Sequence, residues 1–369
     1  MEQHRHAQTI VVKIGSQVLC TPGDESSARL DDKIIASLAA QVSMLSEEGC
    51  KVLVVSSGAV AAGSGFDSKA LRRVTDPVVR KQVQAATGQV LLMERWRQEF
   101  AKHGHGVAQV LTSKSDFQSR RHYLNMRACL EGLIQAEVIP VVNENDVVAT
   151  TELMFTDNDE LAGLLAGMVD ADLLIMLSSV PGLYLGDTAN GEIISRWDES
   201  IHRVEEIVRE GTSRLGRGGM HSKLGIAIDT ASLGTEVVIA NGRTPGVLGC
   251  VARGEELGTR FPASKAVSRT KRWLASAGGH ATAFAVINQG AVEALMDDNR
   301  LTSLLPVGVV SIEGSFDKGD VLLIRDREGN VLGCGKSQFD HVEAEGVIGK
   351  HGQRPLVHYD YLYLSRHGE

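Results

Sequence analysis

Two lysines of the sequence stand where a phosphate group could bind. Lys13 occurs in VVKIGS, near the end of an apolar run and ahead of a glycine that lets backbone N–H groups approach a phosphate closely. Lys223 follows the glycine-rich stretch LGRGG and falls in the first turn of an expected amphipathic helix, where the helix dipole favours anions. In isolation, each could equally be a solvated surface lysine. Together they indicate chemistry on phosphate.

Small and polar side chains that suit a charged substrate follow two other apolar runs. In VVSSGAVAAG, Ser57 is the best candidate to meet a carboxylate at a helix start, although a serine there is often only an N-cap. VVNENDVVAT places Asn143, Glu144, Asn145 and Asp146 directly after a run that should be buried. An acidic group at this place could bind a substrate ammonium, and the alternative is a simple polar turn.

A third polar motif, FTDNDELAGLLAGM, comes soon afterwards. Asp157, Asn158 and Asp159 stand at the expected start of a helix and could be no more than an N-cap with acids that compensate the helix dipole. Their nearness to the NEND motif favours one acidic, amide-lined pocket made by both. His103 and His105 have no third ligand at a suitable spacing, so we predict no protein metal site.

These residues need a fold in which the ends of several strands meet. Short β-branched runs predict buried strands at residues 9–14, 51–56, 106–111, 137–142, 172–177 and 235–240. Amphipathic patterns predict helices at residues 31–48, ended by Gly49, and at 78–102, 119–135, 159–169 and 220–233. This alternation predicts an α/β fold: a three-layer αβα sandwich with a mostly parallel sheet, whose ligands gather beyond the carboxyl ends of the strands.

The composition excludes several classes of protein. With 369 residues, 43% of them hydrophobic, the chain can form one large core and a smaller second one. A net charge of −8 disfavours a dedicated nucleic-acid binder. Five cysteines without a C-x-x-C pair indicate neither disulfides nor zinc, and the absence of a signal-like start or a long apolar run predicts a cytoplasmic protein with no membrane partner. No G-x-x-x-x-G-K-[ST] or G-x-G-x-x-G motif supports a P-loop or Rossmann fold.

The sequence predicts two domains. Residues 1–260 carry the strand and helix alternation, whereas residues 261–277 are polar and basic, as expected of a linker. Residues 278–369 contain brief alternating segments separated by turn residues. We therefore expect a small C-terminal β-rich barrel or sandwich.

Seven short motifs together resemble one family. VVKIGS, SSGAVAAG, RRHYLN, IPVVNENDVVAT, FTDNDELA, SSVPGLY and GRGGMHSK occur in the order and approximate spacing of glutamate 5-kinases, in the amino-acid-kinase family. The tail from about residue 279 resembles the PUA module of many bacterial glutamate 5-kinases. The resemblance implies the amino-acid-kinase fold followed by a PUA-like barrel.

The resemblance also implies an activity, which is transfer of the ATP γ-phosphoryl group to the γ-carboxylate of L-glutamate in the first step of proline biosynthesis. It further implies Mg²⁺, feedback inhibition by proline, and a dimer or tetramer. Lys13 and Lys223 would be catalytic, and Asp159 would organise these lysines instead of accepting a proton. Glutamate-binding positions are matched by Ser57, Asp146 and Asn158. Nucleotide-binding positions are matched by Lys13, Ser178, Ser179, Arg217, Gly218, Gly219, Met220, His221, Ser222 and Lys223.

Two alternatives remain open. One is a related carboxylate kinase acting on N-acetylglutamate or aspartate, although Asp146 and Asp159 favour a free substrate ammonium. The other is a catalytically weak, RNA-associated regulatory homologue, motivated by the tail and by Ser178-Ser179. Thr156, Ser178-Ser179 and Arg217 depart from the family pattern. For the tail itself, RNA binding stands beside a structural or oligomer-contacting role, which we favour.

Overall fold

The computed structural model describes most of the chain as two compact units. The described residues are 9–21, 29–64, 71, 73–118, 120–148, 157–185, 192–198, 200–202, 220–264, 274, 278, 281, 283–297 and 302–364. Those within 1–113 and 127–266 form the first unit, and those within 114–126 and 267–369 form the second.

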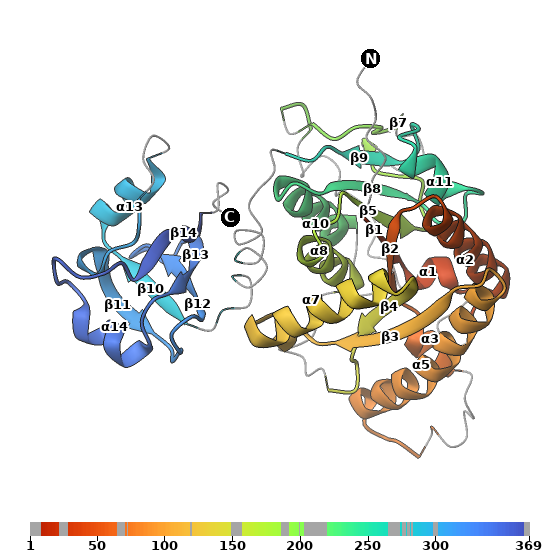
Figure 1. Ribbon diagram of the computed structural model, residues 1–369, viewed down its shortest axis with the longest axis horizontal. Helices are drawn as coiled ribbons and strands as arrows, with labels where there is room; N and C mark the ends of the chain where they lie inside the picture. Colours follow the sequence, from red (N-terminus) through yellow and green to blue (C-terminus); the bar gives the residue numbers. More distant parts are fainter. Residues whose placement is uncertain are drawn as a thin grey trace. The chain divides into compact units, whose positions relative to one another are not determined.

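The first unit is built on a seven-stranded sheet (Figure 1). Its strands, from edge to edge, are β3 (Gly106–Thr112), β4 (Val138–Glu144), β2 (Lys51–Ser56), β1 (Thr9–Ile14), β5 (Leu173–Ser178), β8 (Glu236–Asn241) and β9 (Thr259–Phe261). All neighbouring pairs are parallel except β8 and β9. The prediction of a mostly parallel sheet is confirmed. A short hairpin of β6 (Tyr184–Leu185) and β7 (Glu192–Ile193) follows β5.

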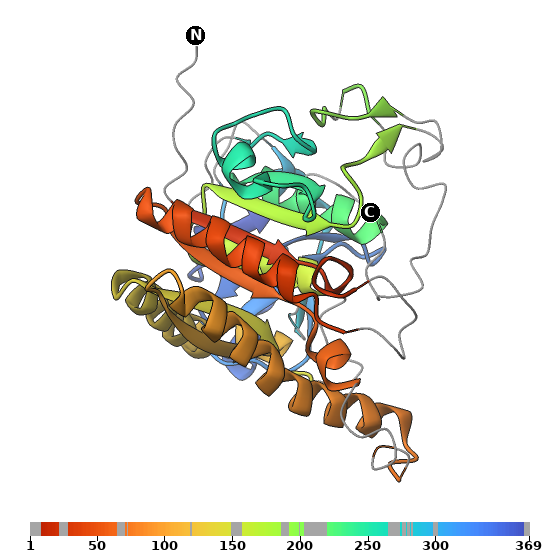
Figure 2. The ribbon, with the colours of Figure 1, turned by 90° about the vertical axis from the view of Figure 1, so that its right-hand side faces the viewer.

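Helices cover both faces of this sheet. Ile10, Val12 and Ile14 of β1 point into a core closed by α2 (Asp32–Glu47), α5 (Pro77–Ala101) and α11 (Val247–Ala252), and Figure 2 looks onto α2 and α5. Because side chains alternate along a strand, Lys13 points to the other face, where α8 (Asn158–Met168) and α10 (Met220–Ser232) pack. The three-layer αβα sandwich is therefore confirmed. The described residues before α8 also form α1 (Ser16–Leu19), α3 (Ala59–Ser64), α6 (Lys114–Gln118) and α7 (Arg120–Gln135), of which α6 and the start of α7 fall in the second unit.

Local sequence explains where these helices begin and end. The aspartates Asp31, Asp76 and Asp157 are the N-caps of α2, α5 and α8, and each accepts hydrogen bonds from two backbone N–H groups of the first turn. Gly49 follows the end of α2 with a φ of 90°, which a side chain would disfavour. The predicted helix end at this glycine is confirmed.

The second unit has its own five-stranded sheet. The strands, in spatial order, are β11 (Val309–Glu313), β10 (Phe284–Ile287), β12 (Val321–Arg325), β13 (Val331–Ser337) and β14 (Val357–Leu364). The described helical elements after β10 are α13 (Gln289–Met296), the 3-10 turn η1 (Pro306–Gly308) and α14 (His341–Val347). A separate apolar core includes Ile287, Leu322 and Val357. The predicted C-terminal β-rich unit is confirmed, and its described strands form one mixed sheet.

The segment between the two sheets is only partly described. Strand β9 pairs with β8 as far as Phe261, so it extends into the interval 261–277 that the sequence predicts as a linker. Of that interval, the structure describes residues 261–264 and 274. The domain limits themselves stay a prediction. Within the described part of the chain, no helix combines the length and apolar character needed to cross a membrane.

Candidate active site

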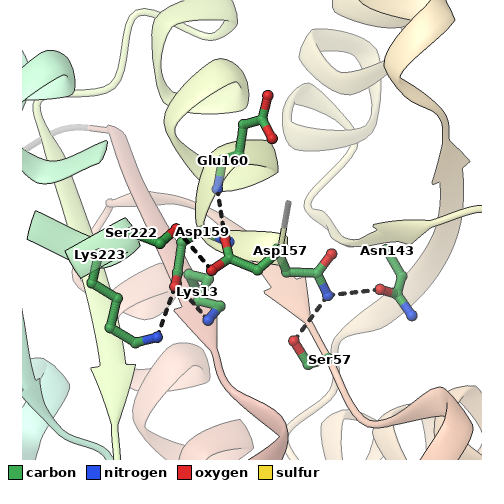
Figure 3. A network of polar contacts seen from close by, with 9 residues as sticks. Lys13, Ser57, Asn143, Asp157, Asp159, Glu160, Ser222 and Lys223 are labelled. Carbon is green, nitrogen blue, oxygen red and sulfur yellow. Dashed lines mark hydrogen bonds and ion pairs between the residues drawn. The ribbon is translucent and has the colours of Figure 1, made fainter. Parts of the chain in front are cut away.

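Polar residues collect at the carboxyl edge of the parallel sheet. Lys13 and Ser178 lie at the carboxyl ends of β1 and β5, Asn143 lies near the end of β4, and Ser57 directly follows β2. Since these strands are parallel, their carboxyl ends share one edge of the sheet. The first turn of α8 reaches the same edge, so the site combines strand ends with the start of a helix (Figure 3).

Asp159 joins two lysines from distant parts of the chain. Its Oδ1 lies 2.5 Å from Lys13 Nζ, and its Oδ2 accepts a hydrogen bond of 2.8 Å from Lys223 Nζ. The Asp159 side chain is fully buried, and the Lys13 side chain is only 5% exposed. Two cations held by one anion leave a net positive charge, which suits the binding of a phosphate.

The pKa values of the two acids at the start of α8 shift in opposite directions. Burial would raise the pKa of Asp159, but the charges of Lys13 and Lys223 outweigh it and lower the pKa to about 2. Burial, together with the negative charge of Asp159, raises the pKa of Asp157 above its ordinary value. Asp159 is therefore a carboxylate at neutral pH and is unsuited to accept a proton from a substrate.

Asp157 connects α8 with α10. Its Oδ1 caps α8 by accepting from the backbone N–H groups of Asp159 at 2.8 Å and Glu160 at 3.2 Å. Its Oδ2 accepts a hydrogen bond of 3.1 Å from the hydroxyl of Ser222, which directly precedes Lys223 in α10. The cap therefore also fixes the position of the helical turn that carries Lys223.

Asn158 points to a chain of polar side chains away from the lysines. Its Nδ2 donates to Ser57 Oγ and to Asn143 Oδ1, both at 2.9 Å. Asn143 in turn donates to Gln89 Oε1 of α5 at 2.9 Å. Asn143 and Gln89 are 3% and 7% exposed, so this amide chain lies inside the protein and not on its surface.

Ser57 is positioned by backbone contacts around β2. Its N–H donates to the carbonyl of Ile14 at 3.0 Å, which ties the end of β2 to the end of β1. Gly58 follows with a φ of 106°, a conformation that favours glycine, and α3 then begins. The neighbouring Ser56 accepts a hydrogen bond of 3.0 Å from the indole of buried Trp96. The serine hydroxyl is thus presented at a fixed place.

Of the predicted nucleotide residues, Ser178 ends β5, which lies beside β1, and Ser179 directly follows the strand. Ser178 is buried, whereas Ser179 is exposed and donates from its hydroxyl to Gln17 Oε1 of α1 at 2.8 Å. The contact joins the loop after β5 to the short helix after Lys13. The end of β5 therefore lies beside the segment that follows Lys13.

The structure brings together several of the predicted site residues, and their roles stay predictions. Lys13, Ser57, Asn158, Asp159 and Lys223 belong to the connected contacts described above. Asp146 lies in the turn after β4, and Met220 and His221 precede Ser222 in α10. Arg217, Gly218 and Gly219 lie outside the described residues, as does the departure Thr156.

Sequence reasoning missed Gln89 altogether, and for Asp157 it considered an N-cap or a shared acidic pocket but not the contact with Ser222. A signal for Gln89 exists, because it interrupts the buried apolar face of α5, between Gly88 and Leu92. No comparable local signal marks the contact between Asp157 and Ser222, since it joins two helices far apart in the sequence.

The described residues contain no group of three or more His, Cys, Asp or Glu side chains that could hold a metal ion. The acids nearest the lysines are Asp157 and Asp159, and both oxygens of each already have protein partners. This donor set fits a Mg²⁺ ion that is bound mainly by nucleotide phosphates.

Comparisons with known proteins agree with this geometry. The profile of the amino acid kinase family matches residues 8–241, and that of the PUA domain matches residues 284–359. A glutamate 5-kinase of Chlorobaculum tepidum is 44% identical over 98% of this chain and 99% of its own length. Glutamate 5-kinases of Bacteroides thetaiotaomicron and Geobacter metallireducens are 40% and 37% identical, over 96% and 94% of this chain and 98% and 91% of their own lengths. The chain therefore belongs to the amino acid kinase family and, within it, to the glutamate 5-kinase group with a C-terminal PUA domain.

Proposed function

We propose that this protein transfers the γ-phosphoryl group of ATP to the γ-carboxylate of L-glutamate and so forms L-glutamyl 5-phosphate, the first step of proline biosynthesis. The observation that carries the proposal is the buried bridge from Lys13 through Asp159 to Lys223 at the carboxyl edge of the sheet. The names of the relatives support the choice of glutamate as the acceptor.

Electrostatics is the main difficulty of this reaction. An anionic carboxylate must approach a polyanionic triphosphate, and two like charges at 4 Å repel by about 1 kcal/mol in bulk water and by more where water is excluded. Lys13 and Lys223 offset this repulsion and the charge that develops on the transferred group. Asp159 keeps both ammonium groups at a fixed separation before the substrates bind.

The transfer itself requires positioning more than covalent help from the protein. A carboxylate oxygen of glutamate forms a bond to the γ-phosphorus of ATP while the bond from that phosphorus to the β,γ-bridging oxygen breaks, and ADP leaves with the electron pair. The nucleophile is ionised at neutral pH, so no general base is needed. This fits the lowered pKa of Asp159, which makes it a poor base.

Glutamate would be bound by the polar residues on the other side of Asp159. Ser57 and Asn158 are joined by a hydrogen bond and lie where a substrate carboxylate can meet a hydroxyl. Asp146, in the turn after β4, supplies negative charge for a free ammonium. An N-acetylated substrate would leave that charge unmatched, which favours glutamate over N-acetylglutamate.

ATP would be held by Lys13, by the Ser178-Ser179 end of β5 and by the segment from Arg217 to Lys223. Mg²⁺ bound to the phosphates supplies further neutralisation of their charge. The residues of the chain nearest that ion would be Asp157 and Asp159.

Feedback inhibition by proline and assembly into a dimer or tetramer are also part of the proposal. Both are supported by the membership of the family and not by a described contact. Sedimentation of the full chain with and without proline would test the assembly, and the enzyme assay below would test inhibition.

A second proposal concerns the PUA domain. Tyr359 and Tyr361 are exposed on β14, and Lys336 Nζ lies 5.2 Å from the centre of the Tyr361 ring. Exposed aromatic rings beside a cation suit the stacking of unpaired bases, which favours binding of single-stranded RNA. Salt-dependent binding of a labelled RNA that weakens in Tyr361→Ala would support this role. Equal affinity in both proteins would leave the domain a structural or oligomer-contacting one.

The test of the main proposal is ATP- and Mg²⁺-dependent formation of an acyl phosphate, trapped with hydroxylamine. L-Glutamate, N-acetylglutamate and L-aspartate should be compared, each with and without proline. We expect turnover selective for glutamate and suppressed by proline. Turnover selective for another acceptor would reassign the substrate, and no turnover with any of them would favour the regulatory homologue.

A further inference from the structure

Gln89 is a buried polar residue that the proposed reaction does not use. It lies on the face of α5 that carries the buried residues Ala85, Leu92 and Trp96, and it is 7% exposed. Its Oε1 accepts from Asn143, while its Nε2 is buried without a hydrogen-bond partner in the described part of the structure. Because an unpartnered buried amide N–H destabilises a fold, the residue indicates a function for its oxygen.

The direction of the amide chain is set by a backbone group. The N–H of Glu144 can only donate, and it donates to Asn143 Oδ1 at 2.9 Å. The other end of the Asn143 amide must then be its NH₂ group, which Gln89 Oε1 accepts at 2.9 Å. Gln89 therefore adds a second contact, at the NH₂ end of the amide, that stabilises the orientation in which the Asn143 oxygen faces Asn158.

This orientation determines what Asn158 and Ser57 offer to a ligand. Asn158 uses both hydrogens of its NH₂ group, one toward Asn143 and one toward Ser57. Its Oδ1 is buried and has no hydrogen-bond partner among the described residues. Ser57 accepts through its oxygen, so its own hydrogen remains able to donate. The site thus presents one acceptor and one donor side by side.

We infer that Gln89 is a positioning residue for glutamate binding, acting through Asn143 on Asn158. This inference rests on the proposed function, in which Asn158 and Ser57 bind glutamate. An acceptor beside a donor matches a ligand that carries both an ammonium and a carboxylate group. Without the Gln89 oxygen, the buried Asn143 NH₂ group loses its acceptor, and the Glu144 N–H is left as the described contact that keeps the Asn143 oxygen toward Asn158.

The kinetic test compares three variants of the full chain. Gln89→Leu should raise the KM for glutamate about tenfold, roughly the effect of one buried hydrogen bond, with the KM for ATP unchanged. Gln89→Glu keeps an oxygen where Asn143 donates and should restore most of the affinity for glutamate. Gln98→Leu, at an exposed position of the same helix, is the matched control and should change neither KM.

A second measurement does not depend on turnover. NMR of the ¹⁵N-labelled full chain should show slow hydrogen exchange for the Asn158 side-chain amide, lost in Gln89→Leu and kept in Gln89→Glu. The inference is overturned if Gln89→Leu leaves both the glutamate KM and this exchange unchanged, or if it raises the KM values for ATP and glutamate alike. If the unmodified protein fails to phosphorylate glutamate, the proposed function fails, while the exchange result still decides the role of Gln89.

Discussion

The ammonium group of Lys13 lies 2.5 Å from Oδ1 of Asp159, in an ion pair that is almost completely buried. Lys13 comes from the central strand of the sheet, and Asp159 comes from the first turn of α8. The second oxygen of the same carboxylate holds Lys223. The separation of the two lysines therefore depends on a single side chain.

Replacing either lysine should abolish most of the activity without unfolding the protein. Lys13→Ala and Lys223→Ala are each expected to lower kcat by about 100- to 1000-fold, because in the proposed reaction each lysine offsets the negative charge of the transferred phosphoryl group. The hydroxylamine assay measures the loss, and circular dichroism checks the fold. Lys33→Ala, at an exposed position in α2, is the control and should retain full activity. Near-normal turnover in both active-site variants would contradict their proposed roles.

Replacing the acid between the lysines should affect both activity and acid stability. The pKa of Asp159 is lowered from 3.8 to about 2 in the folded protein, so its ionisation stabilises the fold above pH 3.8. That contribution is lost as the pH falls from there through about 2. Asp159→Asn should therefore lose less stability than the unmodified protein over this interval, measured by urea unfolding. It should also lower kcat, since the two lysines, which repel each other, are no longer held in place by a shared carboxylate.

If Asp159→Asn and the unmodified protein lose stability equally between pH 4 and pH 2, the ion pairs do not determine this part of the acid sensitivity. Asp32→Asn, at an exposed position in α2, serves as the control for removal of a surface carboxylate. It should leave both kcat and the acid profile nearly unchanged.

Asp157 should tolerate loss of its charge but not loss of its oxygen. Its raised pKa means that ionisation is unfavourable in the folded state, and this effect grows as the pH rises above the ordinary value of 3.8. Asp157→Asn keeps an N-capping oxygen, and the Ser222 hydroxyl can accept from the new amide. In thermal unfolding at neutral pH, Asp157→Asn should be as stable as the unmodified protein or more stable. Asp157→Ala loses the cap and should cost about 1 kcal/mol. Equal losses in both variants would show that the charge is required.

The contact between α3 and α5 should be intolerant of added volume. A Cβ at Gly88 would lie 1.8 Å from the backbone oxygen of Ala59, the first residue of α3. Gly88→Ala should therefore destabilise the protein by about 1–3 kcal/mol and, because α3 follows Ser57, raise the KM for glutamate. Gly132→Ala in α7 meets no atom within 4 Å and should be neutral or stabilising. Denaturant unfolding and the enzyme assay distinguish the two.

Much of the fold was predictable because its signals are local. The apolar runs of β1 and β2 match the observed strands, and Gly49 ends α2 as predicted. Lys13 and Asp159 could be selected from their motifs, since each stands at a strand or helix end. The amide chain from Gln89 to Asn158 could not, because it depends on how α5 packs against the end of β4. Such contacts arise only when separate elements come together.

The first turn of α8 has a consequence for the distance between the two substrates. Asn158 faces the amide chain and Asp159 faces the lysines, although the two residues are adjacent. Along a helix, neighbouring residues are about 1.5 Å apart in height and point about 100° apart. In the proposed reaction, the residue facing the glutamate subsite (Asn158) and the residue facing the phosphate subsite (Asp159) are therefore placed by the same helical turn. If α8 shifts as a body, Asn158 and Asp159 move together, so the spacing that these two side chains set between the two proposed subsites stays the same.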